Sequence, residues 1–197
     1  NVSLELTYLS KHMEEGYPGN LDVKVTYTLN NKDELSVLYE AETDKKTIIN
    51  LTQHSYFNLS GDFSEDILDH QIKINANAFL PVDETLIPSG EIRSVLGSPF
   101  DFRKSKLIGQ DIDVNNKQIE FGKGYDHCWV INNQSNGLRS VATAYHSESG
   151  RLLDVYSDLP GLQFYSGNFL DGTLKSKKEG YYELRSGFCL ETQYYPD

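Results

Sequence analysis

Three ionisable side chains interrupt strand-like stretches of this sequence, and their types could do chemistry. His54 lies in Thr52–Gly61, where aromatic residues are mixed with hydrogen-bonding ones. Asp126 stands just before an apolar run that starts at Cys128, and Glu191 lies inside Phe188–Gln193. Rings mixed with donors and acceptors are typical of a pocket that binds a polar, ring-shaped ligand. The groups themselves can hold or exchange a proton.

Each of the three residues also has a plainer interpretation. His54 could be a surface histidine at a strand end, and Glu191 a solvated carboxylate on an outer sheet face. Asp126 could bond to its own turn backbone, with His127 an ordinary loop histidine beside it. Strand alternation adds one condition: if Phe188 and Leu190 face the core, Cys189 and Glu191 share the opposite face.

The sequence lacks several motifs that are typical of other catalytic and metal-binding sites. The five histidines never pair at the spacing of a metal motif, so no metal ligand is predicted. No Cys-x-x-Cys is present for zinc or redox chemistry, and no Gly-x-Ser-x-Gly supports a hydrolase triad. Gly122–Gly124 lacks the spacing and the following helix of a phosphate loop.

The elements that must position these residues are strands. Apolar and polar residues alternate in most segments, and no convincing amphipathic helix is visible. We predict an all-β fold, a large antiparallel β-sandwich, with residues 1–197 forming one domain. One helical turn is expected within Lys104–Asp113, and mostly loop over Phe79–Phe102. The expected strands are 2–9, 21–29, 35–43, 48–51, 71–76, 128–132, 141–146, 152–157, 162–166 and 188–193.

Composition excludes some partners. The formal net charge is −11, which disfavours binding to nucleic acid or to an anionic membrane surface. Apolar runs are too short to span a bilayer. Cys128 and Cys189 each lie in an apolar run, which predicts buried free thiols in a reducing compartment. A cytoplasmic location is therefore expected.

Seven stretches, taken together and in order, resemble the aldose 1-epimerase (galactose mutarotase) family. The resemblance spans nearly the whole chain, and several of the matches are long. The matching stretches are Glu15–Leu21, Asn50–Leu59, Pro99–Arg103, Gly124–His127, Ser149–Arg151, Pro160–Asn168 and Leu190–Asp197.

The resemblance implies a fold, a reaction and a set of roles. The family fold is a large antiparallel β-sandwich, and its reaction interconverts the α and β anomers of a free aldose without a metal or organic cofactor. Glu191 matches the family's catalytic base and His54 its catalytic acid. Asp126 and Gln163 match residues that hydrogen-bond sugar hydroxyls. A carboxylate suits removal of the C1 hydroxyl proton, and an imidazolium suits protonation of the ring oxygen.

Four aromatic residues are candidates for packing against the apolar face of the sugar: Tyr56, Phe57, Phe164 and Tyr165. Core packing is the alternative for each, and Tyr56 is the one we assign to substrate binding. The expected partner is a small aldose such as galactose or glucose, bound by a monomer or weak dimer. Two other functions stay open, namely a hexose 6-phosphate 1-epimerase and a carbohydrate-binding module without catalysis.

The sequence departs from the family pattern at its ends. Family members carry an earlier Asn-Arg pair and a second histidine, and a closing strand after the Pro-Asp that here is Pro196–Asp197. We therefore expect the domain to be incomplete at both ends.

Overall fold

A computed structural model describes residues 1–135 and 137–196. Two compact units are distinguished, Asn1–Leu51 and Thr52–Asp197. Almost all regular structure in the described residues is β-strand, and every strand pairing is antiparallel. The predicted all-β, antiparallel fold class is confirmed, while the single domain stays a prediction.

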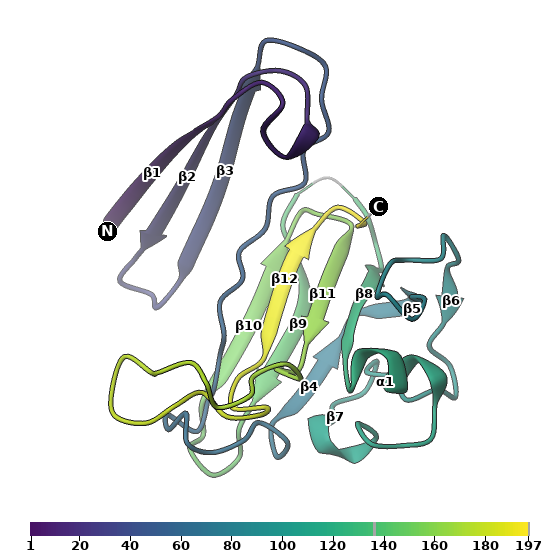
Figure 1. The fold of residues 1–197 in the computed structure, drawn as a ribbon. Coiled ribbons are helices and arrows are strands. Elements are labelled where there is room, and N and C mark those ends of the chain that lie inside the picture. Colours follow the sequence, from purple (N-terminus) through teal and green to yellow (C-terminus); the bar gives the residue numbers. More distant parts are fainter. Residues whose placement is uncertain (136, 197) are drawn as a thin grey trace. The chain divides into compact units, whose positions relative to one another are not determined.

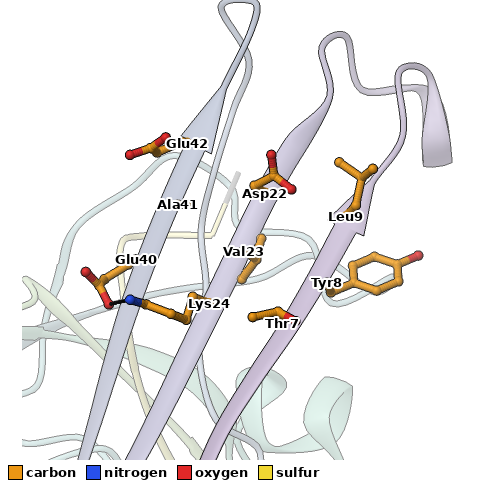
Figure 2. A pocket seen from close by; sticks show the side chains of 9 residues that line it. All are labelled: Thr7, Tyr8, Leu9, Asp22, Val23, Lys24, Glu40, Ala41 and Glu42. Atoms are coloured by element: carbon orange, nitrogen blue, oxygen red, sulfur yellow. Dashed lines mark ion pairs between the residues drawn. The ribbon is translucent and has the colours of Figure 1, made fainter.

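The first unit is a three-stranded sheet in the order β1-β2-β3. Its strands are β1 (Val2–Ser10), β2 (Leu21–Leu29) and β3 (Leu35–Thr43). Thr7, Lys24 and Glu40 are partners in one row across the sheet. Lys24 Nζ lies 2.7 Å from Glu40 Oε2 in this row (Figure 2). The hairpin predicted from strict alternation is confirmed.

The expected strand at Ile48–Leu51 is wrong. These residues carry no regular structure, and Ile48 is 78% exposed. An apolar run alone does not make a strand, because a strand also needs a partner for its backbone groups.

The second unit consists of two antiparallel sheets (Figure 1). One has the order β10-β9-β4-β7 and the other β12-β11-β8-β5-β6. The strands are β4 (Gln71–Ile74), β5 (Ala76–Leu80), β6 (Arg93–Ser94), β7 (Lys106–Leu107), β8 (Asp126–Ile131), β9 (Arg139–Tyr145), β10 (Leu152–Ser157), β11 (Gly161–Tyr165) and β12 (Cys189–Gln193).

The core of this unit lies between the two sheets. Ile72 of β4 and Val141 of β9 belong to the same buried cluster as Trp129, Phe164 and Leu190 of the other sheet. The predicted sandwich packing is thereby confirmed. Because neighbouring residues in a strand point to opposite faces, the residues between these core positions face away from the cluster.

Helical structure is short. The helix α1 (Lys117–Gly122) was not predicted, because six residues give too little periodicity to recognise. Its start is capped by Asn116 Oδ1, which accepts a hydrogen bond from the Gln118 backbone N–H at 2.9 Å. Single 3₁₀ turns occur at Glu14–Gly16 and at Ile108–Gln110, the second within the segment expected to hold a turn. Over residues 1–135 and 137–196, no helix has the length and hydrophobicity to cross a membrane.

Candidate active site

The site is built on the face of β12, β11 and β8 that points away from the core. Phe188 and Leu190 lie in the core cluster, so Cys189 and Glu191 share the outer face, as alternation required. Gln163 of β11 is the direct cross-strand partner of Glu191. On the other side of β11, Tyr165 is the partner of Asp126. Three of the sequence-predicted residues are therefore fixed by strand register.

His54 reaches this face from an irregular segment that is bonded to β12. Thr52 Oγ1 donates to the Thr192 carbonyl at 2.9 Å, and Gln53 Nε2 donates to the Leu190 carbonyl at 2.7 Å. Phe57 and Phe188 then exchange two backbone hydrogen bonds, at 2.7 and 2.9 Å. Side-chain hydrogen bonds and a single backbone bridge therefore hold this segment in place, although it does not form a strand.

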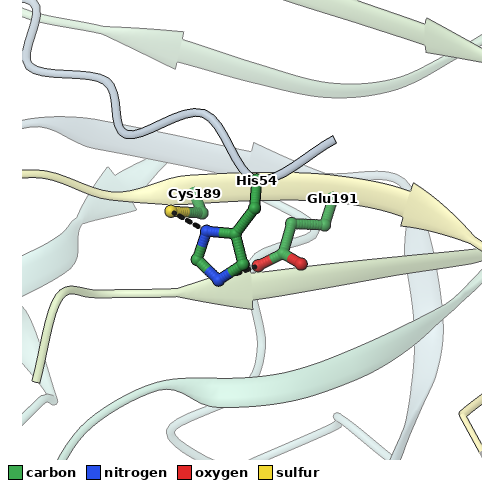
Figure 3. A group of neighbouring side chains, drawn as sticks. All are labelled: His54, Cys189 and Glu191. Carbon is green, nitrogen blue, oxygen red and sulfur yellow. Dashed lines mark hydrogen bonds and ion pairs between the residues drawn. The ribbon is translucent and has the colours of Figure 1, made fainter. Parts of the chain in front are cut away.

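These bonds place His54 beside two residues of β12 (Figure 3). His54 Nε2 lies 3.5 Å from Glu191 Oε1, and His54 Nδ1 lies 3.4 Å from Cys189 Sγ. The imidazole is about half exposed, whereas the Glu191 side chain is buried. A histidine and a buried carboxylate therefore lie side by side, with the histidine open to solvent.

Gln163 and Asp126 form a polar pair next to them. Gln163 Nε2 donates to Asp126 Oδ1 at 2.8 Å. Gln163 Oε1 is buried and has no hydrogen-bond partner among the described residues. Because a buried acceptor without a partner carries a free-energy cost, this oxygen is suited to accept a hydrogen bond from a ligand hydroxyl.

A pocket of about 240 Å³ opens over these residues. This is just below the roughly 300–1,000 Å³ common for small-molecule sites. The lining residues are His54, Leu80, Val82, Leu86, Pro88, Asp126, Cys128, Gln163, Glu191, Gln193 and Pro196. A larger hollow of about 370 Å³ lies over β1–β3 (Figure 2). Its lining contains no histidine, so it lacks the pairing of a histidine with a buried carboxylate that the first pocket has.

Burial shifts the protonation of both carboxylates in the pocket. It raises the pKa of Glu191, and the nearby charge of Asp126 adds to this rise, whereas His54 opposes it. Burial also raises the pKa of Asp126, against the hydrogen bond from Gln163 and the charge of His54. Glu191 is thus a stronger base than an exposed glutamate, which suits proton transfer nearer neutral pH.

The aromatic candidates divide between the site and the core. Tyr56 stacks on His54 with ring centroids 5.1 Å apart, and Tyr165 meets the same imidazole edge-on at 6.1 Å. Tyr56 is not among the residues that line the pocket. Phe164 lies in the core cluster and Phe57 packs against it, so these two cannot contact a ligand in the pocket.

His127 is a buried core residue, so its interpretation as a loop histidine is wrong. The Asp126 backbone N–H donates to its Nδ1 at 3.1 Å, and its Nε2 lies 3.2 Å from Gln118 Oε1. Burial lowers the pKa of His127 to about 3. Gln118 also accepts from the Val82 backbone N–H at 2.8 Å, so the neutral imidazole helps to fix the pocket wall.

Among the described residues, two groups hold the side-chain types that bind metals: His54 with Cys189 and Glu191, and Asp69 with His70 and His146. Neither donor set fits coordination well. Burial raises the pKa of the Cys189 thiol, and the thiolate is the form that ligates. In the second group His70 Nε2 accepts from the Leu59 N–H at 2.9 Å, so its proton stays on Nδ1, the atom facing Asp69. The hydrogen bonds among these side chains explain why they lie close together in both groups.

Sequence reasoning missed several of these neighbours. Gln193 is two positions after Glu191 in the same strand, so the alternation that placed Glu191 on the outer face could also have identified Gln193. The loop residues Val82, Leu86 and Pro88, and the pair His70 and His146, have no local signal, since they are brought together only by the fold.

Comparisons with known proteins identify the family of the chain. The family model for aldose 1-epimerase matches residues 1–197. The chain is 49% identical to the galactose mutarotase of Sus scrofa over 98% of its length and 55% of the relative. It is 39% identical to the aldose 1-epimerase of Escherichia coli K12 over 93% of its length and 52% of the relative.

Solved structures show the same fold. A galactose 1-epimerase from Lactobacillus acidophilus superposes with a TM-score of 0.84 at 34% identity, covering 98% of this chain and 55% of that one. A GalM/aldose epimerase homologue from C. elegans gives 0.85 at 28% identity, with 98% and 57% coverage. The chain thus spans about half the length of these relatives. With the model matched from end to end, the chain belongs to the aldose 1-epimerase family.

Proposed function

We propose that the complete protein interconverts the α and β anomers of a free aldose, with Glu191 as the base and His54 as the acid. The observation that carries this proposal is the 3.5 Å approach of His54 Nε2 to Glu191 Oε1 at the pocket. An acid and a base on one side of a pocket are what ring opening requires.

The proton transfers balance over one cycle. Glu191 takes the proton of the C1 hydroxyl, the bond between C1 and the ring oxygen breaks, and the ring oxygen takes a proton from the His54 imidazolium. The open sugar then rotates about the C1–C2 bond. Closing reverses each transfer on the other face of C1, which returns Glu191 to carboxylate and His54 to imidazolium. No cofactor is needed, since no electron is transferred.

Asp126 and Gln163 hold sugar hydroxyls in this proposal. Their mutual 2.8 Å hydrogen bond orients both side chains, and the free Gln163 Oε1 accepts from a hydroxyl. Tyr56 provides an aromatic surface beside the sugar through its stack on His54. Aromatic faces and fixed polar groups are the usual lining of such a site.

The pocket favours a neutral sugar over a sugar phosphate. None of its lining residues within the described part of the chain is lysine or arginine, and Asp126 and Glu191 would repel a phosphate. The relatives named galactose mutarotase support galactose or glucose as the substrate. Two buried free cysteines support a reducing, cytoplasmic location. We propose a monomer or weak dimer.

Polarimetry of freshly dissolved α-D-galactose and α-D-glucose tests the proposal. We expect the complete protein to speed the approach to anomeric equilibrium, and Glu191→Gln and His54→Asn each to lower the rate by roughly 10²–10⁴-fold. Glu148→Gln, at an exposed carboxylate, is the matched control and should keep the full rate.

Two results would favour the rival functions. A faster rate with glucose 6-phosphate than with glucose would identify a sugar-phosphate epimerase. Calorimetric binding of galactose without any acceleration of anomer exchange would identify a binding module.

A further inference from the structure

Both ring nitrogens of His54 face a side chain of β12 (Figure 3). Nε2 faces Glu191, and Nδ1 lies 3.4 Å from Cys189 Sγ, within the range of a hydrogen bond to sulfur. Cys189 and Glu191 are two positions apart on one strand, so their side chains leave the sheet on the same face. One short strand therefore supplies a partner for each nitrogen.

We propose that Cys189 is a positioning residue for His54, whose thiol holds Nδ1 so that Nε2 is aimed at the pocket beside Glu191. The proposal rests on the proposed function, in which His54 is the acid that protonates the ring oxygen. It adds a residue that touches neither the sugar nor the reacting atoms and acts only through the imidazole.

Apart from the contacts of the two ring nitrogens, to Cys189 Sγ and Glu191 Oε1, the contacts of His54 fix its backbone and its ring plane but not its ring flip. Gln53 donates to the Leu190 carbonyl and accepts from the Ser55 backbone N–H at 2.8 Å, which secures the chain on both sides of His54. Tyr56 stacks on the imidazole and restrains its plane. A half-turn of the ring would keep that stack, yet it would exchange Nδ1 for a carbon. The contact to Cys189 Sγ favours one of the two orientations.

A thiol suits this place because it can both donate and accept. Cys189 is fully buried, and burial raises the pKa of its thiol, with Glu191 and Asp126 adding to the rise. The group therefore stays neutral. When His54 is the imidazolium, or keeps its proton on Nδ1 after giving up the Nε2 proton, sulfur accepts from Nδ1–H. When Nδ1 is unprotonated, the S–H donates to it.

Sulfur is also a weak acceptor, and this matters for an acid that must release its proton. The ionisable groups around His54 are Glu191 and Cys189 of β12, Asp126 of β8, Tyr165 of β11, and Tyr56 of its own segment. A carboxylate at Nδ1 would add a negative charge beside the ring, whereas a thiol orients the ring without adding charge.

Replacement of Cys189 by serine and by valine, in the complete protein, separates positioning from packing. Cys189→Ser keeps a group that donates and accepts, and Cys189→Val fills similar space without one. We expect Cys189→Val to lower kcat about 5- to 10-fold with little change in KM, and Cys189→Ser to keep most of the wild-type rate.

Histidine ¹⁵N resonances supply a readout that does not depend on activity. With His54→Asn used for assignment, Cys189→Ser and Cys189→Val should each change the Nδ1 shift of His54. Identical His54 resonances and identical kcat values in wild type and both variants would overturn the proposal. If the wild type failed to speed anomer exchange, the proposed function would fail, whereas the Nδ1 shift in the serine variant alone would still decide whether Cys189 holds His54.

Discussion

Gln163 lies directly opposite Glu191 on the neighbouring strand and donates a 2.8 Å hydrogen bond to Asp126 one strand further on. A single amide thus connects the side of the site that holds Glu191 with the side that holds Asp126. The hydrogen bond orders both side chains, so in the proposed function they need little further ordering when a sugar binds.

Removal of this amide should weaken substrate binding more than catalysis. In Gln163→Ala, Asp126 loses its hydrogen-bond donor and the sugar loses the Oε1 acceptor. We expect KM for galactose to rise roughly 10- to 100-fold, as for the loss of one or two hydrogen bonds, with a smaller change in kcat. Steady-state polarimetry measures both constants. A kcat loss as large as that of Glu191→Gln at unchanged KM would contradict the role.

The ionised form of Glu191 should lower the free energy of unfolding. Its pKa is raised by burial, so the folded protein binds the proton more tightly than the unfolded chain does. The stabilisation that comes from protonated Glu191 is fully present below the unfolded pKa of about 4.3, and it is lost as the pH rises through the folded pKa.

Glu191→Gln removes that charge and should therefore stabilise the protein by about 1 kcal/mol at pH 8, while the activity is lost. The gain should vanish at pH 4. Urea unfolding at the two pH values measures it, with Glu148→Gln as the exposed control. A Glu191→Gln protein less stable than wild type at pH 8 would show that attraction to His54 outweighs burial.

His127 should make the fold sensitive to acid. Its pKa is lowered to about 3 by burial, whereas an unfolded histidine titrates at about 6.5. The stabilisation that comes from neutral, buried His127 is present above pH 6.5. It is lost as the pH falls toward 3, at up to about 1.4 kcal/mol per pH unit.

His127→Gln should be less stable than wild type at pH 7.5, because it loses its core packing and its contacts to Gln118 and Asp126. Its stability should nevertheless fall less steeply between pH 6.5 and 4.5. Urea midpoints along this pH series give the two slopes. Equal slopes would mean that His127 is not the group that titrates.

Asp69 should stabilise the segment that follows His54 and Tyr56. Its two oxygens face His70 Nδ1 at 2.9 Å and His146 Nε2 at 3.1 Å. Because His70 Nε2 accepts from the Leu59 N–H, its Nδ1 must donate. An asparagine can offer an acceptor to only one imidazole, so Asp69→Asn should cost about 1–3 kcal/mol in urea unfolding. Asp158→Asn, at an exposed position, is the control, and an equal effect in both variants would refute the role.

The sequence by itself determined most of the longer strands and the candidate residues of the site. Alternation gave the three strands of the first unit, and it placed Cys189 and Glu191 on the face opposite Phe188 and Leu190. The ordered motifs gave the family and pointed to His54, Asp126 and Gln163. These features are local, because a period of two along a strand already fixes which side chains share a face.

Only the tertiary structure decided which of these residues meet. His54 lies beside Glu191 because the side chains of Thr52 and Gln53 bond to β12 and Phe57 bridges to Phe188 just before it. No sequence periodicity encodes a segment that is held in this way. The apolar run at Ile48–Leu51 carries no regular structure, because apolar residues in sequence do not by themselves specify a strand. His127 lies in the core because β8 turns it to the same side as Trp129. The contact between Cys189 and His54 arises only when distant segments pack, so its chemistry is a property of the fold.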